Sequence, residues 1–173
     1  MLKIENRATV NAACQYLSMR AGRANIDKGA RGARDIALGV NSGELIRHFD
    51  CLSHLAHGLA DSSGWWIDTE TGEDVRTWPA KFLKLWVSAK LLLVVCEVAE
   101  GYEAYRKGDK NDDHLPHLNG LTVEIADAII RLMDLSVGMR LDVAGAIAEK
   151  LTYNQQRADH KLENRTKDGG KSI

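Results

Sequence analysis

Two short acidic motifs could carry chemistry, because each places two carboxylates one helical turn apart. The first motif is EVAE, with Glu97 and Glu100, and the second is EIAD, with Glu124 and Asp127. Residues three apart lie on one side of a helix. The first motif directly follows the apolar run LLLVVC, where burying an ionised carboxylate costs several kcal/mol unless a cation compensates it. Mg²⁺ and Mn²⁺ prefer oxygen ligands, so the four acids predict a divalent-metal centre.

Two predicted helices position these motifs. The first helix is expected over residues 79–107 and the second over 121–137, and a glycine follows each of them. The polar loop between them is short, so the two helices should pack antiparallel. The first motif lies toward the end of its helix and the second near the start of the next, so the hairpin should bring all four carboxylates together. A lone E-x-x-E is typical of a solvated helix face, but two motifs that meet across a hairpin favour a metal centre.

A polar stripe on the last predicted helix supplies the opposite charge. This helix is expected to begin after Asp142 and to end near residue 158. Lys150, Asn154 and Arg157 recur on it at spacings of i, i+4 and i+7. Lysine offers a point charge, arginine a bidentate fork and asparagine an amide. Facing a metal centre, the stripe would suit a polyphosphate, although by itself it could also be an ordinary solvated face.

The whole chain predicts an all-α fold. A further amphipathic helix begins near residue 45, and no strand-like alternation of useful length appears. Four main helices with short connections favour an antiparallel four-helix bundle. We expect an N-terminal extension over 1–44, an all-α domain over 45–160 and a charged tail over 161–173. The role of the extension stays open between a partner-dependent segment and a basic arm.

Composition and charge favour a cytoplasmic protein. The 173 residues carry a formal net charge of −1, which gives no general case for binding nucleic acids or membranes. The three cysteines form no C-x-x-C pair and fit reduced thiols in a cytosol better than disulfides. The first ten residues carry charges where a signal peptide needs an apolar core. The longest apolar stretch, over 82–99, is interrupted by charged residues, so it predicts a core helix and not a membrane span.

Taken together, the motifs resemble the MazG-like all-α nucleotide pyrophosphohydrolases, particularly short forms common in phages and bacteria. The segments EVAEGYEAYRKG, LPHLNGLTVEIADAIIRLMDLSVG and AIAEKLTYNQQR carry the resemblance. That family is marked by an E-x-x-E helix, a spacer, an E-x-x-D helix, and Lys, Asn and Arg on a later helix. Here the spacer between Glu100 and Glu124 has 23 residues. The similarity covers roughly residues 45–171 and leaves 1–44 outside it.

The resemblance implies hydrolysis of nucleoside triphosphates, often deoxynucleotides, to the monophosphate and pyrophosphate. It also implies dependence on Mg²⁺, with Mn²⁺ able to substitute, and a homo-oligomer, either a dimer or a tetramer. A metal held by the acids would polarise phosphate oxygens and lower the pKa of a bound water. Glu97 or Glu100 would orient that water for attack on the α-phosphorus. Base and sugar preference stay open.

Other residues suggest additional or competing sites. Trp65 and Trp66 could stack against the nucleotide base, although core packing is the commoner use of tryptophan. Asp134 follows Asp127 by seven residues and could be a further ligand or a hydrogen-bond acceptor behind the site. Two H-x-x-H pairs, over 54–57 and 114–117, suggest zinc, but no cysteine or third histidine lies near them in the sequence.

Two rival classes of protein fit an all-α chain. A ferritin-like di-iron bundle needs E-x-x-H on its metal helices, and this chain contains none. A non-enzymatic helical interaction module, with its acids merely exposed, is the alternative that the sequence leaves open. Mg²⁺ or Mn²⁺ should raise the melting temperature of a metal protein and hardly affect such a module.

Overall fold

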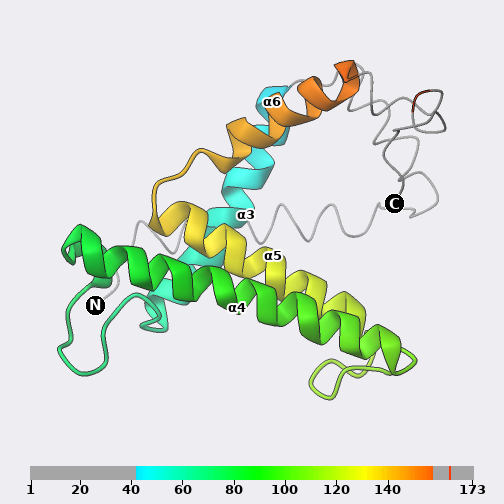
Figure 1. The fold of residues 1–173 in the computed structure, drawn as a ribbon, viewed down its shortest axis with the longest axis horizontal. Helices are drawn as coiled ribbons and strands as arrows, with labels where there is room; N and C mark the ends of the chain where they lie inside the picture. The colour runs from blue at the N-terminus through cyan, green and yellow to red at the C-terminus, as the bar shows by residue number, and fades with distance from the viewer. Residues whose placement is uncertain (1–41, 158–163, 165–173) are drawn as a thin grey trace. The chain divides into compact units, whose positions relative to one another are not determined.

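The computed structural model describes residues 42–157 and Asn164, and helices dominate this part of the chain (Figure 1). The helices are α3 (Ser42–Ser62), the short 3-10 helix η2 (Val75–Thr77), α4 (Ala80–Arg106), α5 (Gly120–Gly138) and α6 (Val143–Gln156). The described residues contain no strand, only two isolated bridges. The all-α prediction is therefore confirmed, and the four main helices have ends close to those expected. The predicted N-terminal extension and charged tail lie almost entirely outside the described residues.

The described residues fall into two units. One unit is Leu52–Leu141, with the end of α3, η2, α4 and α5, and the other contains 42–51 and α6. All four predicted metal-binding acids belong to the first unit. The predicted phosphate-binding stripe belongs to the second. The antiparallel pairing predicted for the two acid-bearing helices is present between α4 and α5, whereas a complete four-helix bundle stays a prediction.

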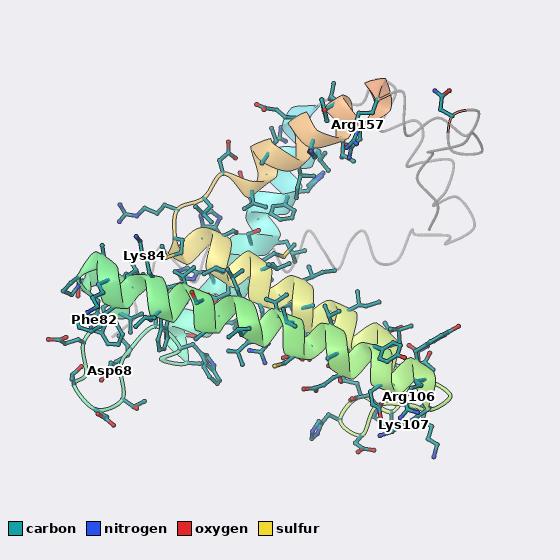
Figure 2. The ribbon with its side chains drawn as sticks, in the orientation of Figure 1. Asp68, Phe82, Lys84, Arg106, Lys107 and Arg157 are labelled. Carbon is teal, nitrogen blue, oxygen red and sulfur yellow. The ribbon has the colours of Figure 1, made fainter. Side chains whose placement is uncertain are left out.

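The α4–α5 hairpin forms the frame of the first unit. Figure 2 places Phe82 and Lys84 near the start of α4, and Arg106 and Lys107 at its far end, where the chain turns back into α5. Pro79 precedes α4 with φ of −52°, a value already suited to a helix start. Its carbonyl accepts hydrogen bonds from the amides of the third and fourth residues that follow it. The helix therefore starts where the sequence predicts.

The loop between α4 and α5 is held by side-chain hydrogen bonds. Asp109 has a positive φ of 48°, and its carboxylate accepts from Asn119 Nδ2 at 2.6 Å and from the amide of Leu121 at 2.9 Å. Asn119 in turn caps α5 by accepting from the amide of Thr122 at 3.1 Å. These bonds tie the end of α4 to the start of α5, so they fix how the two helices align.

A small aromatic core lies at the other end of the hairpin. Trp66, Val75 and Leu135 are buried together, and further apolar side chains pack around them, namely Trp78, Trp86, Val87 and Met139. Gly138 makes room for the Trp66 ring, because a Cβ at this position would lie only 2.2 Å from a ring atom. The glycine predicted to end α5 is thus its last helical residue, and it also lets the indole pack against the helix.

In the second unit, Asp142 caps α6 as the sequence predicts. Its Oδ1 accepts from the amide of Gly145 at 2.8 Å. Among the helices described in both units, none has the length and apolar character needed to cross a membrane.

Candidate metal centre

Three carboxylates meet near the loop end of the α4–α5 hairpin. Glu97 and Glu100 of α4 and Glu124 of α5 each offer an oxygen, and these oxygens lie within 4.8 Å of one another. Glu97 is buried, Glu124 is half-buried and Glu100 is exposed. Oxygens this close can ligate one cation of the size of Mg²⁺ or Mn²⁺. The hairpin therefore gathers three of the four predicted ligands into one acidic group.

The two helices approach each other closely at this point because residue 101 is glycine. A Cβ at Gly101 would lie 3.2 Å from the Cβ of Glu124 and 3.5 Å from Cδ1 of Leu121. One turn nearer the loop, a Cβ at Gly120 would lie 3.1 Å from the Cβ of Ala104. A larger side chain at position 101 would displace Glu124 from the acids of α4.

The crowding of negative charge changes the ionisation of Glu124. Partial burial, a hydrogen bond to Glu97, and the charges of Glu100, Glu97 and Asp127 together raise the pKa of Glu124 to about 6, from an ordinary value of 4.5. Each of these causes penalises the ionised form. A cation among the carboxylates would remove the penalty.

Among the residues that the structure describes, one cationic side chain pairs with the acidic group. Arg131, on α5, donates from Nε to Oε1 of Glu97 at 2.5 Å. The Arg131 side chain is 39% exposed and that of Glu97 only 8%, so the pair extends from the interior to the surface. Arg131 was not among the residues predicted from the sequence. Arg131 follows Asp127 by four residues and Glu124 by seven, so it lies on the same face of the helix as these acids. This spacing could have predicted from the sequence that Arg131 lies near the acidic group.

The seam between α4 and α5 carries charges along much of its length. Away from the loop, Lys90 donates from Nζ to Oδ2 of Asp134 at 3.0 Å. The pair of Glu97 with Arg131 comes next, followed by the remaining acids. If Asp127 is included, the described part of the chain places four carboxylates near the loop end and one paired guanidinium, which binds Glu97. Positive and negative charges are therefore matched at the end of the seam with Lys90 and Asp134, whereas the described acids outnumber the described cations at the loop end.

Asp127, the fourth predicted ligand, lies outside the group of three and lines a cavity. The cavity has a volume of about 800 Å³, lies between α3, α4 and α5, and has mainly apolar walls. Arg131 also lines it, so the cavity adjoins the acidic group. Trp65 is 62% exposed and forms part of the wall. This position leaves Trp65 free to contact a bound molecule.

Trp66 has a core position. The side chain is fully buried, and Nε1 donates to Oδ1 of Asp134 at 2.7 Å. The same carboxylate is hydrogen-bonded to His57 Nδ1 at 2.8 Å and to Lys90. Asp134 is therefore a buried acceptor that joins α3, α4 and α5, and Trp66 has a structural role here, while its predicted nucleotide contact stays a prediction. No group of three potential metal ligands among the described residues includes a histidine.

The polar stripe of α6 is described within its own unit. Lys150 and Asn154 lie on the helix and Arg157 follows its last residue. The Nζ of Lys150 lies 4.9 Å from the centre of the Tyr153 ring, and the Cζ of Arg157 lies 5.7 Å from it. Both cations thus contact one aromatic ring. Their predicted contact with substrate phosphates stays a prediction.

Comparison with family models, with curated proteins and with solved structures finds no match to this chain.

The pKa of Glu124 predicts that the metal-free protein loses stability as the pH rises. Because this pKa is about 6 in the folded protein and ordinarily 4.5, the folded state binds the proton more tightly. The resulting stabilisation is full below about pH 4.5 and is lost as the pH rises through about 6. In urea unfolding with EDTA, the free energy of unfolding of wild type should fall relative to that of Glu124→Gln across this window, so that the variant is the more stable protein near neutral pH. Glu70→Gln, at an exposed loop position, should show no such trend, and equal profiles for all three proteins would refute the prediction.

Gly101→Val should weaken both the fold and the response to metal. The new side chain would press on Glu124, and overpacking of this kind costs about 1–3 kcal/mol. We expect a lower melting temperature and a smaller increase on addition of Mg²⁺. Gly58→Val is the matched control, because no atom lies within 4 Å of a Cβ there. An undiminished Mg²⁺ response in Gly101→Val would show that the helix approach is not needed.

Proposed function

We propose that the protein is a Mg²⁺-dependent hydrolase that converts nucleoside triphosphates to the monophosphate and pyrophosphate. The observation that carries the proposal is the group of three carboxylates within 4.8 Å, accompanied by one guanidinium. A solvated helix face would let these side chains separate, whereas here Glu97 is buried against α5. Four negative charges near one positive charge fit a divalent cation. The spacing of Lys150, Asn154 and Arg157 supports a phosphate-bearing substrate.

The donor set fits Mg²⁺ better than zinc or iron. All three close ligands are carboxylate oxygens, and hard cations prefer oxygen, while zinc and iron sites usually include histidine or cysteine. Glu97, Glu100 and Glu124 would hold the ion, with Asp127 adjacent. Bound there, Mg²⁺ would neutralise phosphate charge and acidify water. Mn²⁺ should substitute.

Residues of the protein would supply the proton acceptor, the fixed metal ligand and the contacts with the substrate. Glu100 is the exposed member of the acidic group, so it is best placed to accept a proton from water attacking the α-phosphorus. Glu97 is held by Arg131 and is better suited to fixed ligation. Lys150, Asn154 and Arg157 would bind the phosphates and the departing pyrophosphate, and Trp65 would contact the base.

We also propose that the protein is cytoplasmic and works as a homo-oligomer, and the exposed apolar side chains of α4 support the oligomer. Six large side chains of this helix are each more than 60% exposed, namely Leu85, Leu92, Val95, Val98, Tyr102 and Tyr105. Large apolar side chains left exposed on one helix are typical of a protein contact surface. The same surface would also serve the alternative function, a helical interaction module without enzymatic activity.

A product assay tests the proposed function. Purified protein with Mg²⁺ is given each common dNTP and NTP in turn, and phosphate and pyrophosphate are quantified separately. Monophosphate with pyrophosphate is the expected result. Diphosphate with phosphate would mean that the centre attacks a different phosphorus. No turnover with Mg²⁺ or Mn²⁺, together with no change in melting temperature on addition of either ion, would favour the interaction module.

A further inference from the structure

We propose that Arg131 acts at two points of the site: its Nε orients Glu97, and its terminal nitrogens bind a phosphate group of the substrate. This inference rests on the proposed function and assigns to that site a cationic residue outside the α6 stripe.

The hydrogen bonding of Arg131 leaves most of its donors available. A guanidinium carries five N–H donors in one plane, and Arg131 uses Nε for its bond to Glu97 at 2.5 Å. Among the described residues, neither Nη1 nor Nη2 donates a hydrogen bond. A guanidinium that lies flat against a carboxylate commonly makes two parallel bonds, and this one makes a single bond from Nε. The open edge of the fork has the geometry that phosphate oxygens require.

The surroundings of Arg131 differ from those of the other ion pair in the seam. Lys90 is 12% exposed, and its amino group is held by Asp134 and lies 4.7 Å from the centre of the Trp66 ring. Arg131 is 39% exposed and lines the cavity next to Asp127. Lys90 and Arg131 both line the cavity, but Arg131 is the more exposed of the two and keeps terminal donors that no described residue binds.

The electrostatics of the acidic group create a need for such a residue. A polyphosphate that approaches Glu97, Glu100 and Glu124 meets charges of its own sign. A guanidinium fixed at the edge of the group offsets part of this repulsion at the point where phosphate would enter. The bond from Nε keeps the cation in place, so little side-chain entropy is lost when the terminal nitrogens bind an anion.

Arg131→Gln should weaken pyrophosphate binding without weakening Mg²⁺ binding. Removal of a positive charge beside the carboxylates should leave Mg²⁺ affinity, measured without nucleotide, equal or higher. Loss of the charged fork should weaken binding of inorganic pyrophosphate in the presence of Mg²⁺ by about 10- to 100-fold, and should lower kcat/KM for the best nucleotide by a similar factor. A purely structural ion pair would lower both affinities together.

Isothermal titration of the full-length protein, first with Mg²⁺ alone and then with pyrophosphate in saturating Mg²⁺, measures both quantities. Arg131→Lys keeps the charge without the fork and should fall between wild type and Arg131→Gln. Arg106→Gln is the matched control: Arg106 also donates from Nε to a glutamate on the same hairpin, but at an exposed site away from the acidic group. This control should match wild type in both titrations.

The outcomes separate this inference from the proposed function. If wild type hydrolyses nucleotides and Arg131→Gln binds pyrophosphate with unchanged affinity, the role of Arg131 is refuted and the function stands. If Arg131→Gln loses Mg²⁺ and pyrophosphate affinity together, Arg131 has only a structural role. If wild type neither binds pyrophosphate nor hydrolyses any nucleotide, both proposals fail.

Discussion

Replacement of Glu124 by glutamine should abolish Mg²⁺-dependent turnover while leaving the protein folded. Glu124 is the member of the acidic group contributed by α5, and without its charge the acids of α4 would hold the ion alone. We expect kcat/KM to fall by at least about 100-fold, the effect of removing one preorganised charge from an active site. The measurement is pyrophosphate release from the best nucleotide, with helix content followed by circular dichroism.

The same substitution should make the metal-free protein more stable near neutral pH. Glutamine removes one of several like charges, and these are among the causes that raise the pKa of Glu124 to about 6. The increase in melting temperature on addition of Mg²⁺ should shrink or vanish, since ligand stabilisation depends on binding to the folded state. Glu70→Gln, which changes the same charge in an exposed loop, should keep full activity. Near-normal turnover by Glu124→Gln would refute the assignment of this group as the metal site.

Replacement of Asp134 by leucine should destabilise the protein severely, by about 3–5 kcal/mol. The buried carboxylate is hydrogen-bonded to Trp66 at 2.7 Å, to His57 at 2.8 Å and to Lys90 at 3.0 Å. Leucine would leave the Lys90 ammonium without its counter-charge and the indole N–H without its acceptor. Urea unfolding measures the loss, which should be far larger than that of Asp113→Leu at an exposed loop position.

A double substitution separates the ion pair from the rest of this network. The double variant, Lys90→Met with Asp134→Leu, removes both charges of the ion pair. It should therefore be more stable than the single variant Asp134→Leu by about 1–4 kcal/mol. The residual loss would report the hydrogen bonds to Trp66 and His57. If the double variant were as unstable as the single one, the uncompensated Lys90 charge would not be the cause.

The predictions for Glu124→Gln and Asp134→Leu concern different ends of the seam between α4 and α5. Around Asp134 the buried charges have partners and hold α3, α4 and α5 together. Near Gly101 the acids exceed the cations. Destabilisation is therefore expected from changes at the first end, and loss of activity from changes at the second.

The sequence by itself determined the helices and the faces on which the acids lie. Pro79, Asn119 and Asp142 act at helix starts through bonds to neighbouring residues, so local pattern is enough to place these ends. The i, i+3 spacing of each acidic motif fixes its side of the helix. A short loop makes antiparallel packing the natural arrangement, and α4 and α5 adopt it.

Only the tertiary structure decided which side chains meet. Glu97, Glu100 and Glu124 come together while Asp127 lines the cavity, and Trp66 is buried while Trp65 is exposed. The pairing of Arg131 with Glu97 also joins residues 34 positions apart. Spacing along a helix gives the angle between its side chains, but not the rotation of that helix about its own axis or its alignment with a neighbour. Those two quantities depend on contacts between helices, here the close approach at Gly101 and the Asp109 bonds to the start of α5.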